Sequence, residues 1–297
     1  MDPRAGRPFT RTFGLQSAAM LPEQKSAAGI TYRESGAKDA PALVLLHGIG
    51  STSAGWRLQY GPLGEHLRVI AWDAPGYGGS QPLPGEAPSA EAYALALARL
   101  FDTLAVDKAI IGTNSWGTPT GVVFARLFPQ RVRALVLGGP AAGWGSAPKQ
   151  EREQRAAARI ERVTTLGVKK MREDDATDLV APGTRAQVLE WIKGAEGLNA
   201  SGYAQAARML SQVDVPREIA AVACPVKVVS GEQDRRTPPA TNAKRIAAAA
   251  PNATLQMVPD CGHLPHLEQP EVFNAAVLEM LQAVTPPSAL SAFPLLG

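Results

Sequence analysis

Short apolar runs alternate along this chain with stretches of helical periodicity. Ala42–Leu46 has no polar position, as expected for a strand that is covered on both faces. Residues 30–34 alternate instead and predict a half-exposed strand, and further apolar runs lie at 67–72, 108–113, 132–137, 226–230 and 253–258. Helical patterns lie between them at 89–104, 116–128, 241–250 and 270–284. This alternation predicts an α/β fold with a mostly parallel sheet and helices on both faces.

One long gap interrupts the series of strands. From about residue 143 to about residue 213 the sequence is charged, rich in alanine and helical in pattern, with helices expected at 150–163, 168–179, 184–193 and 201–211. Because strands precede and follow it, we expect this segment to be a helical cap over one end of the sheet. The expected organisation is an N-terminal extension at 1–27, a core at 28–142 and 214–284, a cap at 143–213 and a tail at 285–297.

Charge and cysteine content exclude several classes of function. The formal net charge is only +3, and the basic residues form no block with interleaved aromatics, so no nucleic-acid partner is expected. No apolar run reaches the roughly 18 residues that span a bilayer, and residues 1–20 lack the apolar core of a secretory signal. Cys224 and Cys261 lack metal-ligand spacing and indicate a reducing compartment. We therefore expect a cytoplasmic monomer or homodimer that acts on a small molecule and binds no metal.

Ser115 occupies the position that a nucleophile needs. It lies in Gly112-Thr113-Asn114-Ser115-Trp116-Gly117, between an apolar run and a helical stretch. A strand that turns sharply into a helix holds the hydroxyl at the apex, beside the positive end of the helix. The flanking residues must be small because the turn is close-packed. Gly117 meets this need, whereas Thr113 stands where glycine is usual.

A serine nucleophile needs a base and an acid, and both have candidates. Of the four histidines, His263 lies in a loop just past the last strand and is our predicted base, with His266 as the alternative. His47 and His66 are expected to be structural. Asp234 follows the strand at 226–230 and precedes a Thr-Pro turn, so it is the predicted acid. Glu232, two residues earlier, is the alternative.

Backbone N–H groups would stabilise the oxyanion. The predicted donors are Trp116, which follows the nucleophile, and Ile49, in the loop His47-Gly48-Ile49-Gly50. The glycine-rich segment 73–80 lacks the Lys-Ser or Lys-Thr of a phosphate-binding loop.

Substrate contacts are expected from the core and from the cap. The predicted pocket residues are Gly48, Trp144, Trp191 and Leu264. Arg155, Arg159 and Arg162 share one helix face, which is either solvated or a binding site for a substrate carboxylate.

Together these segments resemble the α/β-hydrolase fold superfamily over about residues 28–284. The resemblance rests on five motifs in order: the His-Gly-x-Gly loop, D-x-P-G-x-G-x-S, the serine turn, G-x-x-D-x-x-T-P-P and G-H-x-P-x-x-E-x-P. It implies a doubly wound, mostly parallel eight-stranded sheet with an inserted helical cap, and the catalytic order Ser115, Asp234, His263. Within the superfamily the chain resembles the single-cap group. Dehalogenases and epoxide hydrolases of that group carry Asp at the nucleophile, and Ser115 argues against both.

The function that this resemblance implies is a serine hydrolase without metal or organic cofactor. It would cleave a small, largely apolar ester or lactone through a Ser-His-Asp triad and an acyl-enzyme. A carbon–carbon bond hydrolase of a ring-cleavage keto acid is the runner-up and gains support if an arginine points into the site. The resemblance is also compatible with a cofactor-free haloperoxidase-like enzyme, and with a ligand receptor on the same fold that is not an enzyme.

Overall fold

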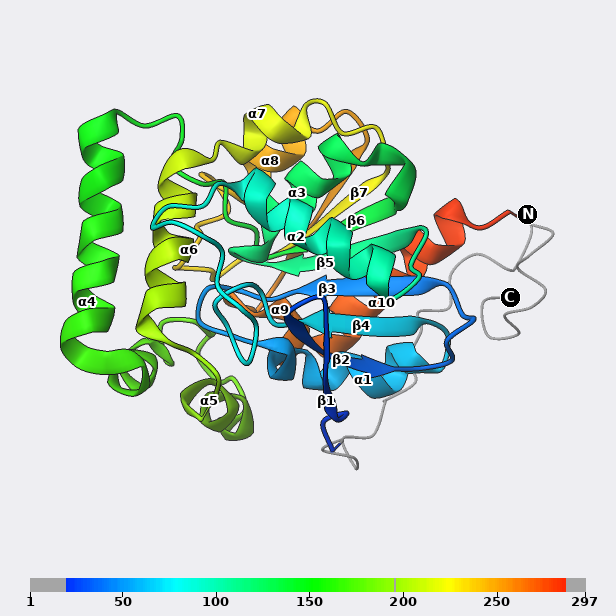
Figure 1. The fold of residues 1–297 in the computed structure, drawn as a ribbon, viewed down its shortest axis with the longest axis horizontal. Helices are drawn as coiled ribbons and strands as arrows, with labels where there is room; N and C mark the ends of the chain where they lie inside the picture. Colours follow the sequence, from blue (N-terminus) through cyan, green and yellow to red (C-terminus); the bar gives the residue numbers. More distant parts are fainter. Residues whose placement is uncertain (1–19, 195, 287–297) are drawn as a thin grey trace.

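A computed structural model describes residues 20–194 and 196–286 of the chain. At its centre lies one eight-stranded sheet with the order β1-β2-β4-β3-β5-β6-β7-β8 (Figure 1). β2 pairs antiparallel with β1 and β4, and all the other neighbouring strands are parallel. The predicted α/β fold with a mostly parallel eight-stranded sheet is therefore confirmed. The strands are β1 (Gln24–Ala27), β2 (Ile30–Ser35), β3 (Ala42–Leu46), β4 (Arg68–Trp72), β5 (Ala109–Asn114), β6 (Val132–Gly138), β7 (Val226–Gly231) and β8 (Ala253–Val258).

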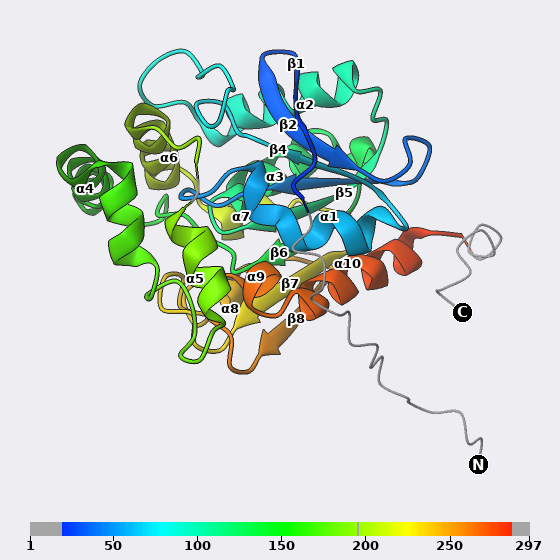
Figure 2. The same ribbon diagram turned by 90° about the horizontal axis from the view of Figure 1, so that it is seen from below.

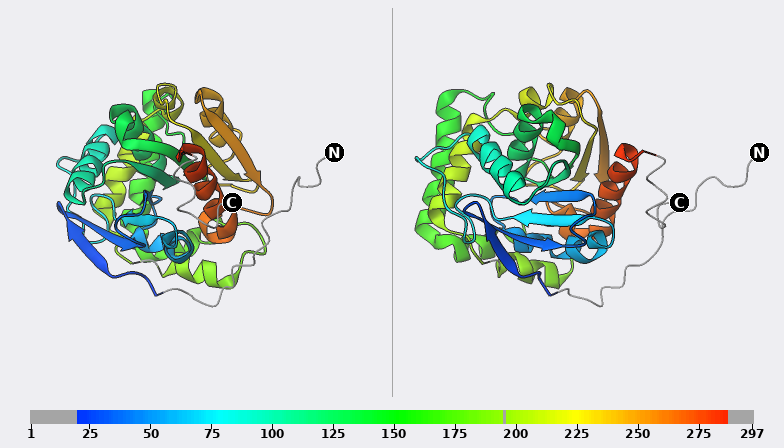
Figure 3. Two further views of the ribbon diagram at one scale, coloured as in Figure 1. Left: turned by 90° about the vertical axis from the view of Figure 1, so that its right-hand side faces the viewer. Right: turned by 45° about the vertical axis from the view of Figure 1, so that its right-hand side comes forward.

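Helices cover both faces of the sheet because successive side chains of a buried strand point to opposite faces (Figures 2 and 3). In β3, Val44 and Leu46 belong to the core beneath one layer of helices, whereas Leu43 and Leu45 belong to the core beneath the other. The first layer contains α2 (Ala90–Thr103), α3 (Gly117–Leu127), α7 (Val215–Ile219) and α8 (Ala243–Ala249). The second layer contains α1 (Arg57–Gly64) and α10 (Pro270–Val284), and the short helix α9 (Pro265–Glu268) contacts both.

Several short elements carry no clear signal in the sequence. β1 falls within the residues expected to form an extension, yet it pairs with β2. α1 contains Gly61 and Pro62, which weaken a helical pattern in the sequence. α7 and α9 are each about one turn long and begin with proline in the first turn, so no periodicity marks them.

The segment between β6 and α7 contains three helices, at the ends of the strands where the arrows point (Figure 1). α6 lies between α4 and the sheet-bearing part of the molecule. α4 is kinked at Gly167, whose φ of 72° lies in the left-handed region that favours glycine. This kink lies between the two helices predicted at 150–163 and 168–179. The helices are α4 (Lys149–Asp175), α5 (Ala186–Lys193) and α6 (Ala200–Gln212).

Hydrogen bonds fix α6 and its approach onto the core. The indole Nε1 of Trp116 donates to Ala206 O at 3.2 Å, and Gln205 Nε2 donates to Leu83 O at 2.8 Å. Asn199 Nδ2 donates to Gly76 O at 2.5 Å. Since Trp116 follows Ser115, the cap helix rests directly on the serine turn. In the part of the chain that the structure describes, no helix is long and apolar enough to cross a membrane.

Thr113, which stands where glycine is usual, finds room because α3 carries a glycine opposite it. A Cβ atom on Gly121 would lie 2.8 Å from Thr113 Cγ2 and 3.3 Å from Ile111 Cγ2. Thr113 is fully buried, and its hydroxyl lies 3.0 Å from the Thr118 hydroxyl. The close approach of strand and helix at Thr113 therefore depends on Gly121 in α3.

This packing predicts that substitutions at Gly121 and Thr113 have coupled effects on stability. We expect Gly121→Ala to lower the free energy of unfolding by about 1–3 kcal/mol, because the new methyl group overlaps Thr113. In a Thr113→Ala background the same change should cost much less. Urea denaturation of the wild type, both single variants and the double variant measures this coupling. Equal costs in the two backgrounds would contradict the packing explanation.

Candidate active site

Ser115 lies on the sharp turn between β5 and α3. Its φ is +50°, in the left-handed region that non-glycine residues seldom adopt. The turn is held because Ser115 N donates to Gly138 O at 3.1 Å and Thr118 N donates to Ser115 O at 3.0 Å. Gly117 is required here, since a Cβ atom would lie 2.3 Å from Leu46 O. Strained backbone that the surroundings hold so firmly is typical of functional sites.

His263 and Asp234 form a buried pair at the ends of two other strands. His263 Nδ1 lies 2.9 Å from Asp234 Oδ2. The carboxylate is fixed in turn, since Oδ1 accepts the N–H groups of Arg236 at 2.9 Å and of Thr237 at 2.8 Å. The Thr237 hydroxyl donates to Oδ2 at 2.7 Å. A proton on Nδ1 that Asp234 accepts leaves Nε2 as the free, basic nitrogen.

The surroundings of Asp234 favour its charged form. Burial by itself raises the pKa of Asp234, but the charge of His263 and the hydrogen bonds from His263 and Thr237 outweigh this effect. The pKa of the carboxyl therefore lies below its ordinary value, and Asp234 is ionised at neutral pH.

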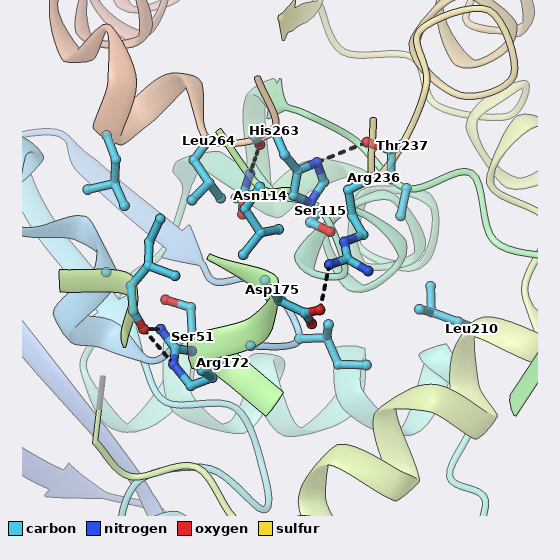
Figure 4. A pocket seen from close by; sticks show the side chains of 18 of the residues that line it. Ser51, Asn114, Ser115, Arg172, Asp175, Leu210, Arg236, Thr237, His263 and Leu264 are labelled. Atoms are coloured by element: carbon cyan, nitrogen blue, oxygen red, sulfur yellow. Dashed lines mark hydrogen bonds and ion pairs between the residues drawn. The ribbon is translucent and has the colours of Figure 1, made fainter. Parts of the chain in front are cut away.

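Ser115, Asp234 and His263, which the sequence predicted as a triad, thus lie at one site. The Ser115 hydroxyl and the His263 imidazole line the same cavity and lie close to each other (Figure 4). No hydrogen bond joins Ser115 Oγ to another described residue. Such contacts are often loose in the free enzyme and tighten when substrate binds.

The loop after β3 passes directly beside Ser115, the predicted nucleophile. A Cβ atom on Gly48 would lie 2.8 Å from Asn114 Oδ1 and 3.3 Å from Ser115 Cβ. The N–H groups of Ile49 and Trp116, the predicted oxyanion donors, bond to no acceptor within residues 20–194 and 196–286. Both groups are therefore available to a ligand in this arrangement.

The other candidate residues have different surroundings. His47 Nε2 accepts the N–H of Ala74 at 3.0 Å, and its Nδ1 lies 2.9 Å from Gly48 O. Burial lowers the pKa of His47, so this neutral ring shapes the loop. His266 packs on Trp56, and burial lowers its pKa to about 3. The alternative acid, Glu232, is exposed.

The cavity, of about 250 Å³, lies between the core and the cap. The four predicted pocket residues, Gly48, Trp144, Trp191 and Leu264, all line it. Within the described chain, no group of three or more His, Cys, Asp or Glu side chains is arranged to hold a metal ion.

Arginine dominates the charge of this cavity. Its described lining includes a single acidic residue, Asp175, whose carboxylate lies 3.1 Å from Arg236 Nη2. The lining arginines are Arg57, Arg155, Arg159, Arg172 and Arg236. Of the three arginines noted in the sequence, two therefore reach the cavity, where they lie over the ring of Trp144. The third, Arg162, pairs with Asp175 at 2.7 Å.

Arg172 differs from the others because its guanidinium is buried without a carboxylate partner. The residue is 7% exposed, and both Nε and Nη2 donate to Ile192 O (Figure 4). No ion pair joins it to an acidic side chain of the described chain. Burial lowers the pKa of Arg172 to about 10, although the charge of Asp175, which forms no ion pair with it, acts in the opposite direction. Arg172 therefore still carries its charge at neutral pH.

Sequence reasoning missed Arg172, although a signal existed. Its spacing from Val168, Ala176 and Leu179 places it on the apolar stripe of its helix, and all three are buried or half-buried. A charged residue on such a stripe is unusual unless something pairs with it.

Comparison with known proteins gives a consistent picture. The alpha/beta hydrolase family model matches residues 43–276. The chain is 30% identical over 253 residues to 2-hydroxy-6-oxononadienedioate/2-hydroxy-6-oxononatrienedioate hydrolase 2 of Pseudomonas putida, covering 82% of this chain and 88% of that protein. It is 28% identical to 3-oxoadipate enol-lactonase 2 of Acinetobacter baylyi, covering 84% and 91%. A malate-bound thermophilic esterase from Thermogutta terrifontis superposes with a TM-score of 0.77 at 29% identity, covering 90% and 99%.

The lowered pKa of Asp234 predicts a specific pH dependence of stability. A carboxyl whose pKa is lower in the folded state adds stability above its unfolded value of about 4, and this contribution is lost as the pH falls through the folded value. Asp234→Asn should lower the free energy of unfolding by about 1–3 kcal/mol at pH 7. The difference from the wild type should shrink toward pH 3.

Urea denaturation at pH 7, 5 and 3 measures this difference. Asp39→Asn, at an exposed aspartate before β3, is the matched control and should differ little from the wild type at each pH. A constant gap between Asp234→Asn and the wild type from pH 7 to pH 3 would contradict the assignment.

Proposed function

This chain belongs to the alpha/beta hydrolase family and is a hydrolase, and we propose that it cleaves a small ester or lactone bearing a carboxylate, with Ser115 as nucleophile. The observation that carries the proposal is the position of Ser115, His263 and Asp234. They follow β5, β8 and β7 and come from distant parts of the sequence. Ser115 and His263 line one cavity, and Asp234 contacts His263 from behind it. The Asp234–His263 distance of 2.9 Å supports a base that is held in one tautomer.

The proposed reaction has two halves, and in each half His263 first accepts a proton and then gives it to the leaving oxygen, which is Ser115 Oγ in the second half. His263 Nε2 takes the proton of Ser115 Oγ as the oxygen attacks the carbonyl carbon, and Asp234 stabilises the imidazolium that forms. The proton then passes to the leaving oxygen as the carbon–oxygen bond breaks, which gives an acyl-enzyme. A water molecule, deprotonated by His263, attacks the acyl carbon and releases Ser115 and the acid.

The oxyanion of both tetrahedral intermediates is assigned to the N–H groups of Ile49 and Trp116. These donors belong to the close-packed backbone around Gly48 and Gly117, so they need not reorganise during the reaction. Loss of one such donor typically costs about 10²–10³-fold in rate.

A carboxylate on the substrate is proposed because of Arg172. A buried guanidinium without an acidic partner is stabilised when an anion binds to it. Arg172 Nη1 would be 3.5 Å from a Cβ atom on Gly50, which places the charge next to the oxyanion loop. The sequence alone predicted a largely apolar substrate. The arginines that line the cavity indicate that this substrate also carries a carboxylate.

The names of similar proteins agree with an acidic substrate. The Pseudomonas putida relative is named for a dioate, and the Acinetobacter baylyi relative is named for a lactone of 3-oxoadipate. The similar Thermogutta terrifontis esterase is described with malate bound. All three names denote acids with carboxylate groups.

Hydrolysis of a carbon–carbon bond in a keto acid is the second candidate. Two observations favour it: arginines face the cavity, and the Pseudomonas putida relative is a hydrolase of such a dienedioate. The same serine would attack a ketone carbonyl, and the leaving group would be a stabilised carbanion. A haloperoxidase-like reaction and a receptor role gain no comparable support.

Loss of the nucleophile should abolish turnover. We expect Ser115→Ala to lower kcat by about 10³-fold or more on p-nitrophenyl esters, since the covalent route is closed. A fluorophosphonate should label the wild type at Ser115 and leave the variant unlabelled. Ser201→Ala, at an exposed serine of α6, is the control and should keep normal turnover. Near-normal turnover by Ser115→Ala would rule out the mechanism.

Arg172 should determine the preference for an acidic substrate. Mono-p-nitrophenyl glutarate and p-nitrophenyl pentanoate have acyl chains of equal length and differ in the terminal carboxylate. The ratio of their kcat/KM values should fall by about tenfold to a hundredfold in Arg172→Gln, because one charge-assisted interaction is lost. Arg172→Lys should give a smaller fall.

Comparing two substrates on one variant separates loss of carboxylate recognition from loss of folded protein. Misfolding would lower both kcat/KM values together and leave their ratio unchanged. Arg245→Gln, at an exposed arginine of α8, is the matched control and should keep the wild-type ratio. An unchanged ratio in Arg172→Gln would refute the role of Arg172 while leaving the serine mechanism intact.

A further inference from the structure

Glu268, the acidic residue of the G-H-x-P-x-x-E-x-P motif, has a role that the triad does not explain. It is the last residue of α9, five positions after His263. Its carboxylate accepts four hydrogen bonds. Two donors are backbone N–H groups of the loop that carries the base: Leu264 N to Oε1 at 2.9 Å and Gly262 N to Oε2 at 2.9 Å.

The other two donors belong to the cap. Ala181 N donates to Glu268 Oε2 at 2.8 Å. The Thr184 hydroxyl lies 3.1 Å from the same oxygen and 2.8 Å from Ala181 O, so the two acceptors share its single proton. These residues are 87 and 84 positions away from Glu268 in the sequence. One carboxylate therefore joins the loop of His263 to the cap segment that precedes α5.

The backbone of His263 is held on all sides as a result. Its own N–H donates to Leu179 O, also in the cap, at 2.8 Å. Its carbonyl oxygen accepts Asn114 Nδ2, next to the nucleophile, at 3.2 Å. Since Glu268 holds the N–H groups on either side, three consecutive amides of the loop are fixed. The remaining freedom of His263 is rotation of its imidazole ring, and the hydrogen bond to Asp234 fixes that rotation.

The base loop and the cap segment also touch backbone to backbone. A Cβ atom on Gly262 would lie 2.7 Å from Ala181 N and 2.7 Å from Val180 C, so any side chain here would push the two apart. Arg185 Nη2 adds a hydrogen bond to Leu267 O in α9 at 3.3 Å. The position of the loop is therefore tied to the position of the cap.

We propose that Glu268 is a positioning residue that aligns His263 with Ser115 and makes this alignment depend on the seating of cap residues 179–184. The inference rests on the proposed role of His263 as the base. Three partners of Glu268 are backbone N–H groups that can only donate, so the position favours a group that only accepts. A carboxylate does this, whereas an amide turns an NH₂ group toward some of the donors.

Glu268→Gln is the first test because it keeps the shape and removes the second acceptor oxygen. We expect kcat to fall by about tenfold to a hundredfold, since a displacement of about 1 Å at a reacting group costs up to about 10²-fold. KM should stay within about threefold, because the cavity wall is unchanged. Glu271→Gln, at an exposed glutamate three residues further on, is the matched control and should keep the wild-type kcat.

Thr184→Val tests the cap side alone and does not depend on Glu268→Gln folding. It removes one donor and leaves both loop donors in place. We expect kcat to fall by about twofold to fivefold with KM unchanged. A wild-type kcat in Thr184→Val would overturn the contribution of Thr184, and a wild-type kcat in both Thr184→Val and Glu268→Gln would overturn the dependence on the cap.

An independent measurement does not require turnover. The His263 Nδ1 proton, bound to Asp234, should give a downfield proton NMR signal that Asp234→Asn abolishes. In Glu268→Gln this signal should shift or broaden, and in Glu271→Gln it should not. An altered signal in Glu268→Gln, together with a Ser115→Ala variant that keeps turnover, would support the positioning role while refuting the proposed function.

A merely structural role for Glu268 predicts a different outcome. Glu268→Gln would then lower Tm, but kcat per folded molecule and the downfield signal would match the wild type. That result would overturn the proposal. A lower kcat with an altered signal in folded Glu268→Gln supports it.

Discussion

Parallel pairing of the six strands β3 to β8 determines where this molecule can do chemistry. Because parallel strands end at the same edge of a sheet, the loops after β3, β5, β7 and β8 converge there although they are distant in the sequence. Ile49, Ser115, Asp234 and His263 come one from each of these loops. The cap enters the chain after β6, at the same edge, and therefore closes the cavity that the loops surround.

Close backbone contact converts this convergence into a defined geometry. Gly48, Gly117 and Gly262 each lie where a Cβ atom would come within 2.8 Å of another part of the chain. The first brings the loop of the proposed oxyanion donor Ile49 against Ser115, the second brings α3 against β3, and the third brings the loop of His263 against the cap. At each contact a side chain would move a reacting group, so the packing of the backbone fixes the site.

Local patterns explain which parts could be predicted. The strands β2 to β8 and α10 were found because apolar runs and helical spacing are visible in a short window, whereas β1 was missed. The serine turn was found because its residue types are restrictive. α1 was missed because Gly61 and Pro62 interrupt its pattern. Arg172 was missed because its surroundings depend on which face of α4 meets the cavity. The contacts of Glu268 with Ala181 and Thr184 join residues more than 80 positions apart, which no local pattern can reveal.

Substrate binding and base alignment share one stretch of the cap. Arg172 begins this stretch, and Asp175, one turn later, pairs with Arg236, two residues after the acid Asp234. Leu179 O then accepts the N–H of His263, and Ala181 N donates to Glu268. With the proposed roles of Arg172 and His263, an anion bound at Arg172 would stabilise the segment that holds the base. Binding energy from a substrate carboxylate can then be used in the transition state, which raises kcat rather than lowering KM alone.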